Sequence, residues 1–158
     1  MNVSIISLCK KQFFMSFDML ALLPDSCTEA VWYEKKNGKA FWHIVFHMLA
    51  GTHYWLRLSP TELPKAFPGK VLYPDFEQEQ IDTLSKADIL GYMEVVRTSC
   101  DTYFQQIRED MLTETSPFSE SVTHLDIILV LMRHIQYHVG ECNTILKENN
   151  IKPVGWIE

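Results

Sequence analysis

One long amphipathic segment near the end of the chain most restricts the folds open to this sequence. Between residues 124 and 148, apolar side chains recur at the three- and four-residue spacing of an α-helix, and they are Leu125, Ile128, Leu129, Leu131, Met132, Ile135, Val139 and Ile145. Thr123, with Asp126 three residues later, predicts the N-cap, and Asn149 ends the pattern. We therefore expect a long helix that lies in the core of a helical protein.

Three earlier segments show the same helical periodicity, at about residues 4–23, 39–58 and 85–111. Pro24 ends the first, and Pro60 ends the second because the residue before a proline is pushed out of helical geometry. No segment of any strength alternates with the two-residue period of a strand. We expect four long helices and no sheet.

The connection between the second and third helices is unusually long. It spans residues 59–84, has no sustained periodicity, and contains Pro60, Pro64, Pro68 and Pro74. Neighbouring antiparallel helices are joined by a few residues, so this length predicts a crossover that runs the length of a bundle. The fold class predicted from the sequence is all-α, a four-helix bundle with a long crossover between helices two and three.

Local signals predict some of the ends and turns. Ser85, with Asp88 three residues later, predicts a capping box at the start of the third helix. Asn37-Gly38 predicts a turn in the first connection, which has room for one helical turn at 29–34. The apolar and aromatic tail, residues 151–157, is expected to pack back on the bundle.

Length, composition and charge exclude several classes of protein. The 158 residues predict one domain, 1–158, and 47% apolar with 22% charged residues is ordinary for a globular protein rather than a disordered or membrane one. The net charge of -6 argues against a nucleic-acid partner, because no basic surface is available to neutralise phosphates. Neither a nucleic acid nor a membrane is an expected partner.

The four cysteines, at positions 9, 27, 100 and 142, lie far apart and form no Cys-x-x-Cys motif. The opening residues 1–8 are apolar but lack the basic start of a secretory leader. We expect reduced cysteines and a cytoplasmic protein. Cys142 is a possible soft metal ligand, and a small buried apolar residue is the preferred interpretation.

Histidines interrupt the apolar stripes of two helices. His134 and His138 are four residues apart, and Glu141 falls about 20° from His134 on the same helical face. His43 and His47 are spaced in the same way on the second helix. Paired imidazoles that point the same way are what two ligands of one metal ion require. We expect a metal site built jointly by these two helices.

The competing interpretation is packing, because a lone histidine on an apolar face is more often a hydrogen-bonded core residue than a ligand. Two pairs on two core helices favour a shared metal, since several buried imidazoles without a common partner would leave unsatisfied nitrogens. His53 and His124 point away from the pairs, and we expect them at the solvent edge.

These features resemble the DinB-like superfamily of metal-dependent proteins. The resemblance rests on the long crossover, on Trp-His-Ile-x-x-His-x-Leu in the second helix, and on His-x-x-x-His-x-Gly-Glu in the fourth, and it extends from Phe13 to Trp156. It implies that His47, His134 and His138 bind a divalent ion, with His47 preferred to His43 because of the residues that follow it. This chain has Val139 where relatives often have arginine, and Glu141 where glutamine is common.

The resemblance also implies a range of functions. Three imidazoles leave a coordination position open, as in catalytic zinc sites, and zinc or nickel is the expected metal. We expect a metal-dependent enzyme acting on a small molecule, with transfer of a low-molecular-weight thiol as one option that the resemblance implies, and with Glu141 as an orienting group or general base. The alternatives are a non-catalytic metal-binding stress-response or interaction module, and a helical dimer without metal.

A homodimer is expected as well. The first and third helices carry aromatic residues beyond one stripe, and such a surplus could pair across a two-fold axis: Phe13, Phe14, Phe17, Tyr92, Tyr103 and Phe104. Members of the resembled superfamily are often dimers. The competing expectation is that the crossover and the Trp156 tail cover this surface within one chain.

Overall fold

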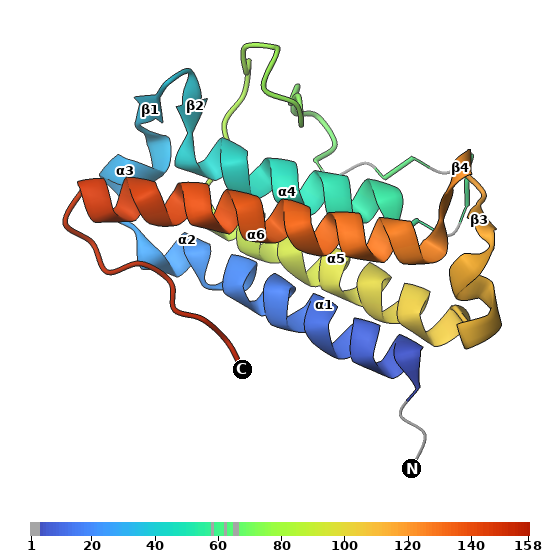
Figure 1. Cartoon of the computed structure of the whole chain (residues 1–158). Helices are drawn as coiled ribbons and strands as arrows, with labels where there is room; N and C mark the ends of the chain where they lie inside the picture. Colours follow the sequence, from blue (N-terminus) through green and yellow to red (C-terminus); the bar gives the residue numbers. More distant parts are fainter. Residues whose placement is uncertain (1–3, 58, 62, 65–66) are drawn as a thin grey trace.

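Four long helices packed side by side form the molecule (Figure 1). The computed structural model describes residues 4–57, 59–61, 63–64 and 67–158. The helices are α1 (Ile5–Ala21), α4 (Phe41–Trp55), α5 (Lys86–Gln106) and α6 (His124–Glu148). Around the bundle, α6 lies between α1 and α4, and α5 packs on α4 and α1. The predicted four-helix bundle, with its long crossover between α4 and α5, is confirmed.

Shorter elements fill the connections. Two short helices, α2 (Leu23–Ser26) and α3 (Glu29–Tyr33), follow α1. Pro24 therefore lies in the first turn of α2, where its missing N–H is not needed. A 3-10 helix, η1 (Glu109–Thr113), follows α5, so the third helix ends earlier than the expected Met111.

Two small antiparallel ribbons were not expected from the sequence. β1 (Lys35–Lys36) pairs with β2 (Lys39–Ala40), and β3 (Thr115–Ser116) pairs with β4 (Ser119–Thr123). Three of these strands have two residues and cannot show a two-residue period, and β4 has Val122 as its only apolar residue, which is why the pattern missed them. The predicted turn at Asn37-Gly38 closes the first ribbon, and both residues have positive φ, 51° and 82°.

Capping boxes hold the starts of two helices, one at Ser85 as predicted and one at Thr123, where an N-cap was predicted. The hydroxyl of Ser85 accepts from the backbone N–H of Asp88, whose carboxylate accepts from the Ser85 N–H in return. Thr123 and Asp126 repeat this arrangement at α6. Each box satisfies amides that would otherwise lack a partner, so the beginnings of both helices follow from local sequence.

The aromatic residues on which the dimer was argued lie inside the bundle. Phe13 and Phe17 are fully buried, as are most side chains of the set, and Phe14 is half-buried. The ring centroids of Phe13 and Phe104 are 5.3 Å apart, joining α1 to α5. The argument from surplus aromatic residues was therefore wrong. Phe13 and Phe14 meet Phe104 between α1 and α5, whereas Tyr92 packs against α4 and Tyr103 against α6.

The tail returns along α6. The side chain of Asn143 accepts from the N–H of Val154 at 2.8 Å and donates to its carbonyl at 3.1 Å. Ile151, Val154 and Ile157 pack against the core, whereas Trp156 is 74% exposed. The tail packs on the bundle as predicted, with its tryptophan turned outward.

The crossover lies against α4, and hydrogen bonds hold it at residues 73–74 and at residue 84. The indole N–H of Trp32 donates to the carbonyl of Leu84 at 2.9 Å, in a buried bond. The carbonyls of Tyr73 and Pro74 lie against histidines of α4. This contact brings the crossover to the histidine cluster described below. None of the helices in the described ranges is long and apolar enough to cross a membrane.

Candidate metal centre

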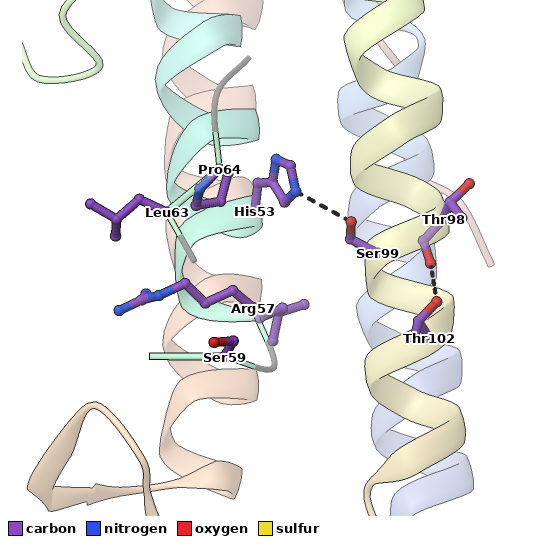
Figure 2. Close-up of a pocket in the computed structure, with 9 residues that line it drawn as sticks. His53, Arg57, Ser59, Leu63, Pro64, Thr98, Ser99 and Thr102 are labelled. Carbon is purple, nitrogen blue, oxygen red and sulfur yellow. Dashed lines mark hydrogen bonds between the residues drawn. The ribbon is translucent and has the colours of Figure 1, made fainter. Parts of the chain in front are cut away.

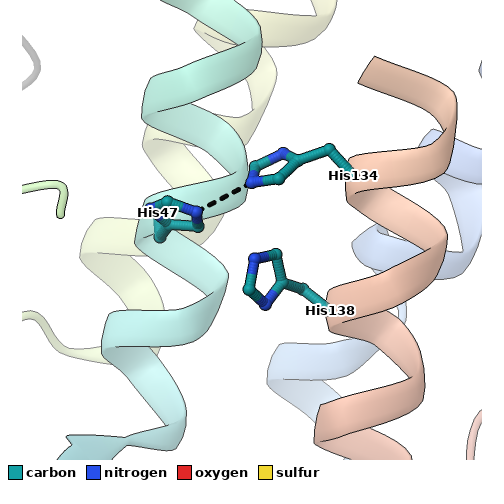
Figure 3. Close-up of side chains that lie close together, drawn as sticks. All are labelled: His47, His134 and His138. Atoms are coloured by element: carbon teal, nitrogen blue, oxygen red, sulfur yellow. Dashed lines mark hydrogen bonds between the residues drawn. The ribbon is translucent and has the colours of Figure 1, made fainter. Parts of the chain in front are cut away.

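Three imidazoles meet between α4 and α6 (Figure 3). His47 comes from α4, and His134 and His138 come from successive turns of α6. One ring nitrogen from each residue lies within 4.8 Å of the others, and the ring centroids are 4.7 to 4.8 Å apart. The three side chains thus converge as ligands of a single ion must.

Helical periodicity and one glycine make this convergence possible. The four-residue spacing points both histidines of α6 toward α4. Gly51, one turn after His47, lies beside His134: a Cβ at this position would sit 3.5 Å from Cε1 of that ring. A methyl group fits there, and a larger side chain would press on the imidazole.

The crossover orients His47. Its Nδ1 lies 2.7 Å from the carbonyl oxygen of Pro74, and a carbonyl can only accept, so Nδ1 carries the proton. The lone pair of Nε2 then points away from the crossover toward the other two rings. Fixing the tautomer through the second ring nitrogen is typical of metal-binding histidines.

A carboxylate orients His138 in the same way. Nδ1 of His138 lies 2.8 Å from Oε2 of Glu141, and the other carboxylate oxygen accepts from Nζ of Lys39 at 3.1 Å. Burial raises the pKa of Glu141, but the bonds to His138 and Lys39 outweigh it and hold this pKa below its usual value. The carboxylate is therefore charged at neutral pH, and Nε2 of His138 is left to face the cluster.

Burial keeps two of the imidazoles neutral. It lowers the pKa of His134 to about 4, aided by charge repulsion from His47 and His138. Burial also lowers the pKa of His47, against the opposing effect of the Pro74 carbonyl. Neutral imidazole is the form that binds a metal ion, so at neutral pH the rings are ready to act as ligands.

His43 lies outside the cluster. Its Nε2 is 3.0 Å from the carbonyl of Tyr73 and 3.0 Å from Nε2 of Gln80. The ring is buried, and its centroid lies 4.9 Å from that of Phe76. Of the two histidines on this face of α4, the structure brings His47 to His134 and His138 and leaves His43 to hold the crossover.

Phe76 covers the cluster from the crossover. Its ring centroid lies 4.4 Å from that of His47 and 5.7 Å from that of His138. Nζ of Lys39 lies 4.1 Å from the centroid of the same ring, a distance typical of a cation–π contact. Sequence reasoning did not find Phe76, since the crossover has no periodicity that would predict its direction.

The expectation of a position at the solvent edge was wrong for His124, whereas the half-buried His53 is compatible with it. His124 is buried, with Nδ1 2.9 Å from the hydroxyl of Tyr103. His53 is half-buried between the hydroxyl of Tyr92, at 3.0 Å, and that of Ser99, at 3.3 Å (Figure 2). Burial lowers the pKa of both histidines. Both act as hydrogen-bonded packing residues.

Cys142 and two further polar residues near the bundle core, Gln136 and Asp18, have structural roles. Cys142 is fully buried, and burial raises the pKa of its thiol, which agrees with the preferred interpretation of a small apolar side chain. Gln136 donates to the hydroxyl of Ser16 on α1. Asp18 pairs with Arg97 across α1 and α5. None of these side chains points to a second reaction centre.

The donor set fits one divalent ion. Three imidazole nitrogens converge, two of them with their second nitrogen engaged by a carbonyl or a carboxylate. Imidazole suits zinc, nickel and copper, and the geometry does not choose among them. Three protein ligands leave room for a further ligand, as in catalytic rather than structural zinc sites.

Comparison with known proteins agrees with this centre. The sequence profile of the DinB superfamily matches residues 15–142, which include all four long helices in whole or in part and all three clustered histidines. No curated protein matches the chain.

Proposed function

Because the chain belongs to the DinB superfamily, we propose that it is a metal-dependent enzyme that acts on a small molecule at an ion held by His47, His134 and His138. The observation that carries this proposal is the convergence of the three imidazoles, with His47 oriented by Pro74 and His138 by Glu141. Zinc or nickel is the proposed ion, on the preference of imidazole for such metals.

A bound ion with an open position supplies Lewis acidity, which lowers the pKa of a coordinated water or thiol. Glu141 is a positioning residue: it holds the Nδ1 proton of His138 and thereby keeps Nε2 free as a ligand. Lys39 occupies its other oxygen, which favours this orienting role over that of general base. Phe76 limits access of water from the crossover side.

Transfer of a small thiol is the more specific reaction that we propose, and its support is the superfamily resemblance together with the affinity of such ions for thiolate. A cytoplasmic location suits this chemistry, and its support is that Cys9, Cys27, Cys100 and Cys142 are all free thiols.

The second candidate is a non-catalytic module in which the ion only ties α4 to α6. The observation that favours it is the contact of Phe76 with His47 and His138, because a covered ion exchanges ligands poorly. The two candidates differ in one property. A catalytic ion accepts an added ligand, whereas a structural one does not.

Metal analysis combined with a cobalt spectrum tests the proposal. The purified protein is expected to hold one divalent ion per chain, and its cobalt form is expected to show a tetrahedral visible spectrum that changes when a thiol is added. A folded protein that holds no stoichiometric metal would overturn both candidates. A cobalt spectrum that no small ligand changes would contradict the catalytic proposal and support the non-catalytic module. If the spectrum does change when a thiol is added, the next experiment is a screen for thiol-dependent turnover.

A further inference from the structure

A cavity of about 570 Å³ opens beside His47, between α4, the crossover and α5. This volume is within the range of small-molecule sites, roughly 300 to 1,000 Å³. One helical face of α4 contributes Ala50, Gly51 and Tyr54, and the crossover contributes Leu63 and Pro74. A molecule in this space would lie against the histidine cluster rather than at a distant surface.

Two wall residues connect the cavity to the metal centre. Pro74 lines the cavity and its carbonyl holds Nδ1 of His47, so one residue shapes both sites. Gly51 also lines it, and the ring of His134, which is not itself part of the wall, lies behind this glycine, 3.5 Å from where a Cβ would be. A ligand can therefore approach the ring nitrogens from the cavity without displacing a side chain at position 51.

The chemistry of the wall is almost entirely apolar. Alanine, leucine, proline and tyrosine side chains dominate it. Among the described residues that line the cavity, Asp75 is the only one with a carboxylate. Its two oxygens accept from the N–H of Glu77 at 3.1 Å and from the side chain of Gln78 at 3.3 Å, which holds the carboxylate in place.

We propose that this cavity binds the apolar, uncharged body of the substrate, whose donor atom reaches the ion at the three histidines. The inference rests on the proposed metal function and names the class of molecule that it serves. An apolar wall gains free energy by removing hydrocarbon from water, whereas Asp75 repels an anionic group brought into the same space. The substrate is thus a neutral, hydrophobic small molecule with one metal-binding head.

The neighbouring cavity does not compete for this role. It measures about 400 Å³, lies between α4 and α5, and is lined by the hydroxyls of Thr98, Ser99 and Thr102 (Figure 2). Its histidine, His53, is already engaged by Tyr92 and Ser99, and none of the three clustered histidines lines it.

The test is a chain-length series of n-alkanethiols, from ethanethiol to hexanethiol, titrated into the cobalt form and followed by the thiolate-to-cobalt absorption band. Affinity is expected to rise about fourfold for each added methylene until the cavity is full. In the variant Ala50→Leu, hexanethiol is expected to bind at least tenfold more weakly while ethanethiol is unchanged. Ala87→Leu, the same change at an exposed position of α5, is the matched control and is expected to behave as the parent.

Charge discrimination gives a second readout. The parent is expected to bind 3-mercaptopropionate several-fold more weakly than butanethiol. Asp75→Asn is expected to reduce this difference in affinity, whereas Asp25→Asn, at an exposed position of α2, is expected to leave it unchanged. Cobalt content is measured in every variant. Full cobalt with a flat chain-length series overturns the cavity assignment alone, and a parent that binds no cobalt overturns the metal function and this inference with it.

Discussion

The Nε2 atoms of His47 and His134 lie 2.7 Å apart, although the two residues are 87 positions apart in the chain. Without an ion, one nitrogen must donate to the other, because two lone pairs at this distance repel. Nδ1 of His47 carries that residue's proton and donates it in a hydrogen bond to the carbonyl of Pro74, so Nε2 of His47 is the acceptor and Nε2 of His134 is the donor. An ion bound to both nitrogens would replace this hydrogen bond, and the proton of His134 would move to its Nδ1.

Removing a ligand of α6 is expected to remove the metal. His134→Ala and His138→Ala should each abolish stoichiometric binding, because two imidazoles do not complete a site. The measurement is metal content per chain after dialysis, by mass spectrometry. His53→Ala is the matched control, since this half-buried histidine bonds to Tyr92 and Ser99 instead. Full retention of metal in both α6 variants would refute the ligand assignment.

Neutralising the carboxylate that orients His138 is expected to weaken the metal site without abolishing it. Glu141→Gln should reduce metal affinity roughly tenfold, at the low end of the range for such partners, since the amide oxygen still accepts from Nδ1. Affinity is measured by competition with a chromophoric chelator. Glu148→Gln is the control, because Glu148 also pairs with a lysine of the β1–β2 ribbon, Lys36 at 3.0 Å, and lies far from the cluster on the same helix. Equal metal affinities in the two variants would contradict the orienting role of Glu141 and show that it only forms a surface ion pair.

Two substitutions of Gly51 are expected to affect helix stability and metal binding differently. Gly51→Ala should stabilise the protein by up to about 1 kcal/mol, because glycine is that much less favourable than alanine inside a helix. It should leave the metal in place, since a Cβ there meets His134 at an ordinary contact distance of 3.5 Å. Gly51→Leu should lower metal affinity by displacing that ring.

Urea unfolding of the metal-free protein measures the first effect, and chelator competition measures the second. Gly140→Ala is the matched control, because a Cβ at this helical position meets nothing within 4 Å. A similar gain in stability is expected there. An unchanged metal affinity in Gly51→Leu would contradict the proposed closeness of Gly51 and His134.

The buried His124 is expected to make stability depend on pH. Burial lowers its folded pKa, although the charge of Glu114 opposes this. Above the unfolded pKa of about 6.5, both states are neutral and the residue contributes nothing to the pH dependence. As the pH falls below that value, the unfolded chain binds the proton first, so the free energy of unfolding decreases.

The replacement His124→Gln should therefore flatten the dependence of unfolding free energy on pH between about 6.5 and 5, while preserving a partner for the Tyr103 hydroxyl. Urea titrations of metal-free protein at several pH values give the slopes. The slope above pH 7 serves as the internal control and should be the same in both proteins. An unchanged slope below pH 6.5 would show that His124 titrates normally.

The homodimer stays a prediction with a different basis. The aromatic residues of α1 and α5 are inside the bundle, but α6 exposes Leu129 and Val130 at 45% each and Tyr137 at 73%. A symmetric contact between two copies would cover these side chains. Light scattering at micromolar concentration should give roughly twice the chain mass of 18.4 kDa, and a mass equal to one chain would exclude the dimer.

Sequence periodicity predicted most of the fold and the two metal-site histidines of α6. The four long helices, both capping boxes and the placement of His134 and His138 on one face of α6 depend on spacing within one segment, which a sequence displays directly. The two ribbons were missed because three of their strands have two residues and β4 has one apolar residue, so neither ribbon shows a period. The burial of His124 was missed because its partner is a tyrosine of α5, Tyr103.

The choice between His43 and His47 could not be made from helical geometry, since both point to the same face of α4. The crossover decides it: the carbonyl of Tyr73 meets His43 and the carbonyl of Pro74 meets His47. Every residue has a backbone carbonyl, so no residue type announces this role. The family resemblance selected His47 by matching its neighbours, and the structure supplies the physical reason.

The 87-residue separation between His47 and His134 also affects how the chain unfolds. An ion held by both helices closes a long loop, as a disulfide would, and withdraws conformational freedom from any partly open state that keeps the ion. Unlike a disulfide, this tie is reversible, and separated histidines in an unfolded chain bind metal weakly. Folding and metal binding would then be linked, so the free energy of unfolding would rise with the concentration of free metal around the protein.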